Sequence, residues 1–159
     1  MNIDFIPNDR VTPHEMLSLA ESVGFGPHRS LDRNKTALAG SIFVASARRD
    51  GALIGLVRLV GDGAYILHLA DLDVHPDFQR RGVGRRLMEM AINFAREAKI
   101  GTGENFGEFT LFANVDADAF YEKLGFILTP NGMVLTDTES RRKTELEFQK
   151  DWTKKREER

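Results

Sequence analysis

The chain has 159 residues, of which 42% are hydrophobic and 29% charged, a balance typical of one globular domain with a substantial core. It contains no cysteine, which excludes disulfides, thiolate metal sites and a cysteine nucleophile. The formal net charge of −2 argues against a protein built to attract nucleic acid. No apolar run is long enough to span a bilayer and no secretory signal is visible, so we expect a cytoplasmic protein.

The N-terminal part predicts helices followed by a hairpin. Thr12 can cap a first helix, because Pro13 suits the first turn and Glu15 completes a capping box. Asp50-Gly51 is a hairpin dipeptide between two apolar segments. The elements expected, in chain order, are a helix from Thr12 to Gly24, a helix over 31–39, strands over 42–47, 53–60 and 64–74, a long helix from Arg85, a strand over 109–113, a helix over 116–124, and short strands over 126–128 and 133–135.

A glycine turn joins the third of these strands to the long helix. Pro76 lacks an amide hydrogen and restricts the residue before it, so the strand should stop there. From Arg85, apolar residues recur at spacings of three and four, which predicts a helix. Gly82 and Gly84 lack a Cβ, so a phosphate can approach the free amides at the helix N-terminus. The turn therefore predicts a pyrophosphate cradle.

The motif in this turn is Q-x-x-G-x-G, from Gln79 to Gly84. A dinucleotide fingerprint would need a small residue in place of Leu87, and a P-loop would need a lysine in place of Arg85. A mononucleotide-binding protein that uses Gly82 and Gly84 stays open as an alternative. Preceded by Val-His-Pro, the motif resembles the acyl-CoA-binding motif of the Gcn5-related N-acetyltransferase superfamily.

A second block strengthens this resemblance. Asn114, Ala117, Phe120, Tyr121 and Lys123 stand in the order N-x-x-A-x-x-F-Y-x-K-x-G-F, which is similar to the closing segment of the superfamily. The segment 21–27 also resembles the front end of a bacterial subfamily. The resemblance covers residues 12–136 and leaves out the tail, in which charges of both signs nearly balance.

The resemblance implies an α/β (α+β) fold: a mixed, mostly antiparallel, splayed sheet of six to seven strands flanked by about four helices. It implies one acetyltransferase domain over 1–138, followed by a charged extension over 139–159. The activity implied is an N-acetyltransferase that moves the acetyl group of acetyl-CoA, its co-substrate, to a primary amine by direct attack in a ternary complex. No histidine spacing suggests a metal. A non-catalytic acyl-CoA sensor on the same fold is the alternative.

The resemblance also implies how coenzyme A binds. The strand over 64–74 should splay from its neighbour, so that the backbone of Leu72 and Val74 binds the pantetheine arm and the Val74 N–H polarises the thioester carbonyl. The four arginines beside the glycine turn are either phosphate ligands or a solvated helix face. The residues expected to bind the cofactor are Leu72, Asp73, Val74, Gln79, Arg80, Arg81, Gly82, Val83, Gly84, Arg85, Asn114, Ala117, Phe120, Tyr121 and Lys123.

Three residues are candidates for the catalytic proton transfers. Tyr121 matches the family tyrosine near the coenzyme sulfur, and a phenol can protonate a departing thiolate; its alternative role is packing. An alkylamine is mostly protonated at neutral pH, so a base is needed, and Asp71 and His68 are the candidates, with Asp71 favoured. Strand alternation would put them on opposite faces unless a bulge intervenes. His68 could instead be a core residue, and Asp71 could pair with an arginine.

Asn114 and the loop after the first helix complete the expected site. Asn114 should bond the pantetheine amide, cap the following helix, or do both. Phe25, His28 and Arg29 are expected to form one wall of the acceptor site. The alternative for Phe25 is that its only role is to pack between the first two helices. We expect a small primary amine as the acceptor, rather than a protein or a nucleic acid, and no membrane partner. A homodimer is left open.

Overall fold

The computed structural model describes residues 2–98, 108–114 and 116–128, together with a few residues between 143 and 154. The chain forms two compact units, Met1–Leu111 and Phe112–Arg159. The domain boundary expected at residue 138 lies outside the described residues, so the division into 1–138 and 139–159 stays a prediction. In the described part of the chain, no helix combines the length and the apolar character needed to cross a membrane.

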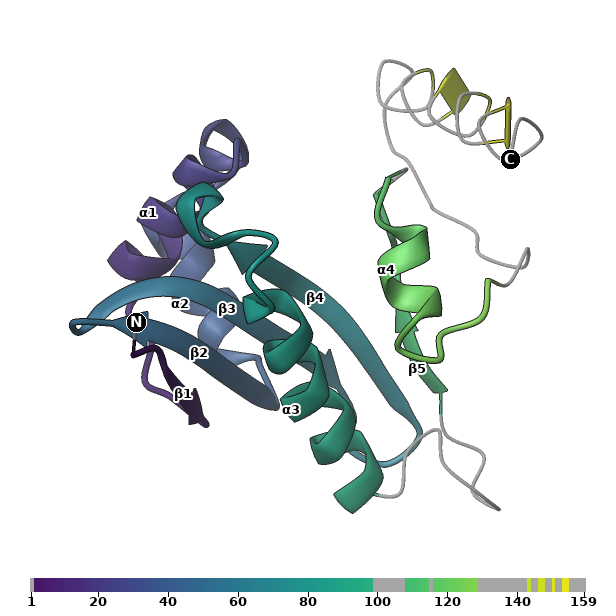
Figure 1. The fold of residues 1–159 in the computed structure, drawn as a ribbon, viewed down its shortest axis with the longest axis horizontal. Coiled ribbons are helices and arrows are strands. Elements are labelled where there is room, and N and C mark those ends of the chain that lie inside the picture. The colour runs from purple at the N-terminus through teal and green to yellow at the C-terminus, as the bar shows by residue number, and fades with distance from the viewer. Residues whose placement is uncertain are drawn as a thin grey trace. The chain divides into compact units, whose positions relative to one another are not determined.

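The first unit is built on a mixed sheet whose strands follow one another in chain order (Figure 1). Antiparallel pairing joins the first four strands, and the last pairs parallel to the fourth. This confirms the mixed, mostly antiparallel α/β fold. The strands are β1 (Asp4–Pro7), β2 (Phe43–Arg49), β3 (Ala52–Gly61), β4 (Ile66–Val74) and β5 (Glu108–Leu111).

The strand count differs from the six to seven expected, since the described residues contain five strands. Residues 126–128 were expected to be a strand, but they follow a helix as irregular chain. The strand expected over 133–135 lies outside the described residues. Conversely, β1 was not predicted, because a four-residue segment that ends in Pro7 carries no clear alternation.

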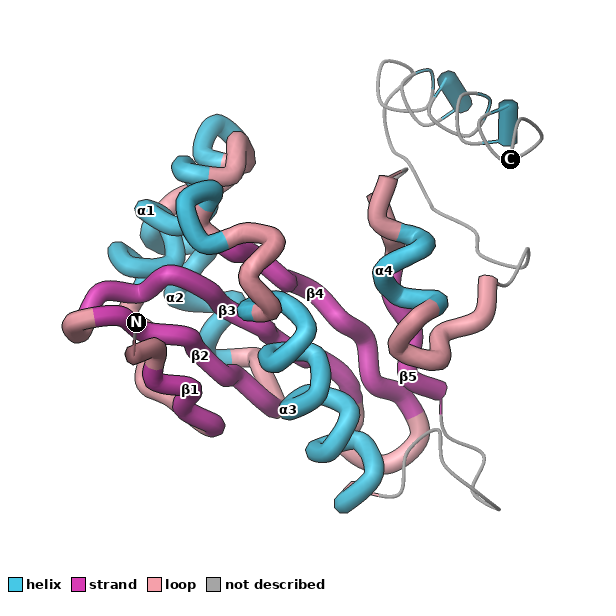
Figure 2. Tube along the Cα trace, in the orientation of Figure 1, coloured by secondary structure: helices cyan, strands magenta, loops and turns pink. Residues whose placement is uncertain are grey.

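Two helices and a short 3-10 turn precede β2, and one long helix follows β4 (Figure 2). The predicted capping box is present: the Thr12 hydroxyl accepts from the amide of Glu15, and the Glu15 carboxylate accepts from the amide of Thr12. The elements are α1 (Pro13–Ser22), η1 (Gly26–His28), α2 (Leu31–Ala39), η2 (Pro76–Phe78), α3 (Val83–Glu97) and, in the second unit, α4 (Asp118–Glu122).

Helix α3 covers one face of the sheet with apolar side chains. The rings of Phe43 and Phe94 stack with centroids 4.7 Å apart. A Cβ on Gly55 would stand 3.0 Å from the Leu87 side chain and 3.2 Å from that of Val83, so the glycine lets α3 lie close to β3. The buried residues of α3 are Val83, Leu87, Met88, Ala91 and Ala95. Their spacing of three and four is the helical pattern read from the sequence.

The opposite face packs on α1 and α2 and is partly polar. Met16 and Leu19 of α1 cover Leu56 of β3 in a small apolar cluster. Around this cluster the sheet buries polar side chains, among them Ser46, Arg58, Asp71 and Asp73. Buried polar groups are costly unless they are paired, so this face cannot be explained by packing alone.

A β-bulge changes which side chains of β4 point to which face. Leu59 pairs with Leu69, yet the preceding Arg58 pairs with Asp71, so Ala70 is an extra residue in β4. Cross-strand partners share a face, and odd and even positions therefore exchange faces at Ala70. As a result His68, which pairs with Val60, lies on the α1–α2 face together with Asp71.

Candidate active site

The glycine turn contains two left-handed residues that bring the chain from β4 into α3. Arg80 has φ +57° and Gly82 has φ +84°, a region that glycine adopts without steric cost. Helix α3 begins at Val83, two residues earlier than expected, so Gly84 lies inside its first turn. Gly82 provides no side-chain cap and the first turn carries no acidic residue. The amides of this turn are therefore available to an anion.

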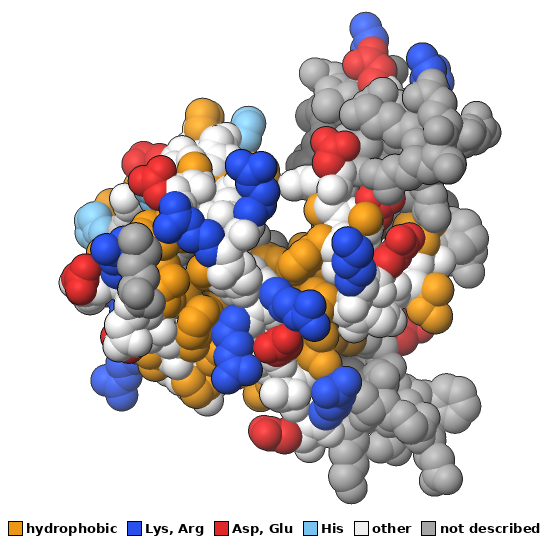
Figure 3. Space-filling view, in the orientation of Figure 1, with side chains coloured by type: hydrophobic (Ala, Val, Ile, Leu, Met, Phe, Trp, Pro, Cys, Tyr) orange, Lys and Arg blue, Asp and Glu red, His pale blue; other side chains and the backbone are white. Residues whose placement is uncertain are grey.

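Arginines surround this helix terminus. Arg85 and Arg86 pair with Glu89 at 3.2 and 3.4 Å, and their side chains are 66% and 59% exposed. Arg81 lies with its guanidinium 6.0 Å from the centre of the Phe78 ring. Figure 3, which looks onto the α3 side of the sheet, shows Lys and Arg side chains spread over that face. Exposed pairs of this kind hold their partners weakly, so the arginines can still supply positive charge to an anion.

Strand β4 has an open edge beside the glycine turn. Pairing with β5 covers only Ile66–Leu69, and within the described residues the rest of β4 has no partner from β5. The amide of His75 donates to the Ile54 carbonyl of β3. Since successive residues of a strand point alternately to its two sides, the backbone N–H groups of Leu72 and Val74 face the open edge. These are the two residues expected to bind the pantetheine arm.

Gln79 fixes the turn to the end of this strand. Its Nε2 donates to the Val74 carbonyl at 2.9 Å, so the side chain expected to be a cofactor ligand has a protein partner. This bond holds the start of the turn against the open edge of β4. The helix terminus and the strand edge thereby lie on one continuous stretch of chain.

Asp71 is held by two arginines. Its Oδ2 accepts from Arg58 Nε at 2.5 Å, and its Oδ1 accepts from Arg29 in a second, shorter contact. Asp71 is 6% exposed, and Arg58 also donates to the Ala37 carbonyl and the Ser41 hydroxyl, both at 3.3 Å. The alternative role of Asp71, pairing with an arginine, is therefore present. Both oxygens of the Asp71 carboxylate are thus occupied by guanidinium groups, which weighs against the base role predicted for it.

The second carboxylate on this strand is Asp73. It lies two residues beyond Asp71 on the same face, is 8% exposed, and has no hydrogen bond or ion pair within the described part of the chain. Burial and, next, the negative charge of Asp71 raise the pKa of Asp73 to about 6, partly offset by Arg29 and Arg58. Its backbone faces β3, so Asp73 does not lie on the open edge where a cofactor ligand was expected.

His68 lies earlier in β4, on the same face of the sheet as Asp71 and Asp73. Its Nδ1 is 3.0 Å from the Thr110 hydroxyl of β5, its cross-strand neighbour. Burial lowers its pKa below the ordinary value, which favours the neutral ring. His68 and Asp71, the two predicted bases, thus share a face because of the bulge at Ala70.

The loop between α1 and α2 reaches the carboxylates through one residue. Of the three residues expected to form the acceptor wall, Arg29 contacts Asp71. Phe25 is 41% exposed, and its amide donates to the Ala20 carbonyl, which closes the end of α1. His28 ends the short 3-10 turn η1. The exposed Phe25 ring leaves room for the apolar contact that we predicted there.

The second unit carries the closing motif. Tyr121 lies on α4, with its ring edge-on to Phe120 and Phe126 at centroid distances of 5.1 and 5.9 Å. Ala117, not Asn114, is the N-cap of α4, and no side chain caps this helix. The Asn114 carbonyl accepts from the Ala117 amide at 2.9 Å. The predicted capping role of the Asn114 side chain is therefore not seen, and the role at the pantetheine stays a prediction.

Sequence reasoning did not name Arg58, the buried partner of Asp71 on β3. It placed His68 and Asp71 on opposite faces unless a bulge intervened, and the extra residue Ala70 is that bulge. The sequence does carry a signal: polar residues of β4 fall on an even position at His68 and on odd positions at Asp71 and Asp73. A change of phase inside one strand is the pattern that a bulge produces. Within the described residues, no group of three or more potential ligands could hold a metal ion.

Comparison with known proteins agrees with the motifs. The pattern of the Acetyltransferase (GNAT) family matches residues 11–126, so the chain belongs to this acetyltransferase family. The uncharacterised N-acetyltransferase ycf52 of Pyropia yezoensis is 35% identical over 130 residues, covering 79% of this chain and 71% of that protein. A GNAT acetyltransferase structure from Streptococcus pneumoniae TIGR4 is 27% identical with a TM-score of 0.70, covering 87% of this chain and all of that one.

Two further relatives have names that specify different acceptors. Histone acetyltransferase TAP1 of Glycine max is 30% identical over 142 residues, covering 82% of this chain and 58% of that protein. Serotonin N-acetyltransferase 2, chloroplastic, of Oryza sativa subsp. japonica is 30% identical over 115 residues, covering 70% of this chain and 54% of that protein. Membership of the family therefore leaves the acceptor open.

Proposed function

We propose that this chain is an acetyl-CoA-dependent N-acetyltransferase that moves the acetyl group to a primary amine by direct attack in a ternary complex. The observation that carries the proposal is the helix terminus at Gly82, uncapped and ringed by arginines, joined through Gln79 to an open strand edge. An anion-binding terminus next to a free strand edge suits a ligand with phosphates at one end and an amide-bearing arm at the other.

Each part of the cofactor has a proposed partner. The pyrophosphate would bind the amides of Val83, Gly84 and Arg85, and the pantetheine arm would extend β4 along Leu72 and Val74. The outward N–H of Val74 would donate to the thioester carbonyl as negative charge develops on its oxygen. A preorganised donor of this kind lowers a barrier by about 3 kcal/mol.

Tyr121 is proposed to give a proton to the departing thiolate, and Asn114 to bond the pantetheine amide. A Tyr121→Phe variant keeps the ring contacts with Phe120 and Phe126 and removes only the hydroxyl. Its single-turnover rate should fall by about 10²- to 10⁴-fold while acetyl-CoA affinity stays the same. An unchanged rate would assign Tyr121 to packing.

For the acceptor we propose a small primary amine with an apolar or aromatic body. The exposed Phe25 ring and the acidic α1–α2 face support this choice, since they offer an apolar contact and an attraction for an ammonium. The name of the rice relative is compatible with it, and that of the soybean relative is not. The cytoplasm remains the proposed location, and a homodimer remains open.

A sensor that binds acyl-CoA without transferring it is the second candidate. One observation favours it: the favoured base, Asp71, is occupied by two arginines. Such a protein would bind acetyl-CoA but would transfer its acetyl group to no amine. Tyr121, present in the closing motif, favours the enzyme.

Binding and turnover of acetyl-CoA test these proposals together. Calorimetry should detect binding, and a hundredfold excess of ligand over its Kd should stabilise the fold by about 2.7 kcal/mol. Gly84→Val places a branched side chain at the first turn of α3 and should abolish both effects. Ala98→Val, at the exposed far end of the same helix, is the matched control. Unchanged affinity for acetyl-CoA in a folded Gly84→Val variant would rule out the proposed pyrophosphate site at this helix terminus.

A panel of arylalkylamines, polyamines, amino sugars, amino acids and lysine peptides should then reveal the acceptor. We expect the highest kcat/KM with a small amine. Preference for a lysine peptide over every small amine would contradict the acceptor while keeping the transferase. Binding without turnover on any amine would establish the sensor.

A further inference from the structure

Of the two buried aspartates of the sheet, Asp73 is the one without a hydrogen bond or ion pair among the described residues. Asp71, two positions away, is bound by Arg29 and Arg58, and Glu15 and Asp9 are bound by Arg48. Asp73 is nonetheless buried, with 8% of its surface exposed. A buried carboxylate without a partner costs folding free energy, which a structural role would not require.

The position of Asp73 relates it to the cofactor edge of β4. It lies between Leu72 and Val74, whose backbone N–H groups face the open edge. Its side chain points to the α1–α2 face, as its pairing with Leu56 requires. A thioester polarised by Val74 would therefore have this carboxylate on the adjacent residue.

We propose that Asp73 is the catalytic residue that accepts the proton of the acceptor ammonium, and that Asp71 positions the loop at Arg29. This inference rests on the proposed acetyl transfer and goes beyond it by naming the base. It replaces the predicted base, Asp71, with a neighbour two residues further along the same face.

The proton balance is simple. The ammonium gives one proton to the Asp73 carboxylate, and the neutral amine attacks the thioester carbonyl, forming the C–N bond. When the C–S bond breaks, the Tyr121 hydroxyl gives its proton to the thiolate. The second proton on the nitrogen then passes to Tyr121 and restores its hydroxyl. Asp73 then releases its proton to solvent, so that an amide, a thiol and one proton are the products.

The charged groups that act on Asp73 set the pH at which it works. They are Asp71 on its own strand, Arg58 on β3 and Arg29 from the loop before α2. With a pKa of about 6, Asp73 is ionised at pH 7 and can accept a proton, and it is more basic than an ordinary aspartate. Activity should therefore fall as the pH is lowered through 6, because the protonated carboxyl cannot accept.

The test compares three nearly isosteric variants by their pH–rate profiles. Asp73→Asn should lower kcat/KM at pH 7 by about 10²- to 10⁴-fold and remove the fall in activity near pH 6. Its rate should recover partly at high pH, where free amine is abundant. Its acetyl-CoA affinity, measured by calorimetry, should stay within about twofold of the original protein, since the carboxylate does not contact the cofactor in this scheme.

Asp71→Asn should keep the fall in activity at low pH, the acid limb of the pH–rate profile, and move it to lower pH. It removes the negative charge that raises the pKa of Asp73 and leaves the two arginines that lower it. A purely structural Asp71 would lower the rate or the stability without displacing the limb. If this variant does not fold, carbon-13 NMR of the aspartate carboxyls in the unmodified protein gives the answer, since Asp73 should titrate near pH 6.

His68→Gln separates the remaining candidate. An acid limb that disappears in His68→Gln and persists in Asp73→Asn would overturn the proposal and assign the base to the histidine. A full rate in folded Asp73→Asn would overturn it as well, while acetyl transfer itself stands. Acetyl-CoA binding without turnover in the unmodified protein would overturn the proposed function, and with it the need for a base.

Discussion

The two faces of the central sheet solve different problems. On the α3 face, residues such as Ala47, Val57 and Leu59 are fully buried and apolar, and the helix packs close over Gly55. On the α1–α2 face, the sheet buries Arg58, Asp71 and Asp73 beside a small apolar cluster. The first face gains stability from burial, and the second gives some of it up to hold charges in fixed positions.

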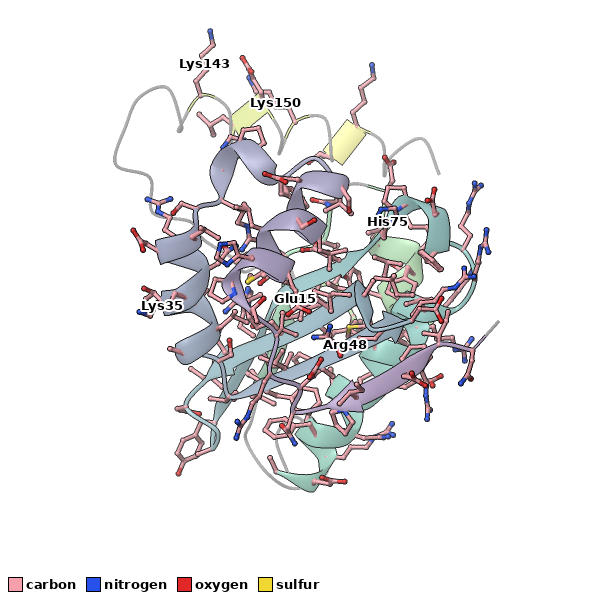
Figure 4. The ribbon with its side chains drawn as sticks, turned by 90° about the vertical axis from the view of Figure 1, so that its left-hand side faces the viewer. Glu15, Lys35, Arg48, His75, Lys143 and Lys150 are labelled. Carbon is pink, nitrogen blue, oxygen red and sulfur yellow. The ribbon has the colours of Figure 1, made fainter. Side chains whose placement is uncertain are left out.

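The difference shows where function can be sought in a small α/β unit. Charges on the α1–α2 face are fixed by long-range pairs, such as Arg29–Asp71 and Arg48–Glu15. Figure 4 shows Glu15 and Arg48 on this side of the molecule. Among the described residues of the sheet, Asp73 is the buried charge without a partner, and it is therefore the group to question. Four changes test this contrast, taken from the largest expected effect to the smallest.

Leu87→Ala should have the largest effect on stability. Leu87 is fully buried between α3 and β3, and removal of a buried leucine side chain costs about 2–5 kcal/mol of unfolding free energy. Urea denaturation measures the loss. Leu87→Met conserves volume and should cost less than about 1.5 kcal/mol. A loss below 1 kcal/mol in the alanine variant, on the order of a surface change, would mean that the α3 face is not the main source of stability.

Arg58→Met should cost about 3 kcal/mol, because it removes one partner of a buried carboxylate. Arg29 still contacts Asp71, which keeps the cost at the low end of the range for buried pairs. The double variant Arg58→Met, Asp71→Leu should recover much of the loss, since the carboxylate that lost a partner is then removed as well. If the double variant is no more stable than Arg58→Met, the pair is not the cause.

Asp73→Asn should increase stability at pH 7 by about 2 kcal/mol. Burial raises the pKa of Asp73 from 3.8 to about 6, so the folded protein binds a proton that the unfolded chain has released. The stability of the original protein should therefore fall as the pH rises from 4 to 6, and a shift of two pKa units corresponds to roughly 3 kcal/mol. Thermal unfolding at several pH values should show this slope, and the asparagine variant should lack it. A destabilised asparagine variant at pH 7 would contradict the unpaired state of the carboxylate.

Glu15→Gln should give the smallest effect, of opposite sign. The hydrogen bond from Arg48 is the largest cause that lowers the pKa of Glu15, from 4.5 to about 2. The stability from this pair is present above pH 4.5 and is lost as the pH falls toward 2. The side chain is 31% exposed, so we expect about 1 kcal/mol after solvent screening. The free energy of unfolding should depend less steeply on acidic pH in the variant. The same slope in both proteins would show that the Glu15–Arg48 pair does not cause the loss of stability in acid.

Much of the fold could be read from local patterns. The capping box at Thr12, the hairpin at Asp50-Gly51 and the apolar stripe of α3 are each decided by neighbouring residues, and the structure contains all three. The glycine turn follows from the same local chemistry, since Gly82 adopts a left-handed conformation directly before the helix.

The charged face could not be read in the same way. Arg29 and Asp71 are 42 residues apart in the chain, and Arg58 and Asp71 are 13 apart. Nothing local selects these partners among the many acids and bases of the sequence. The assignment of a base therefore depends on tertiary structure, because only the ion pairs of Asp71 with Arg29 and Arg58 distinguish it from Asp73.

The extra residue at Ala70 has a consequence for anyone who mutates β4 systematically. Positions 67 and 69 face α3, whereas positions 71 and 73 face α1 and α2, although all four have the same parity. A scan of hydrophobic replacements should therefore show a jump in tolerance in the middle of one continuous strand. Deletion of Ala70 would restore uniform alternation and turn either the two leucines or the two aspartates to the wrong side. Transplanting this acidic pair into another sheet would require moving the bulge with it.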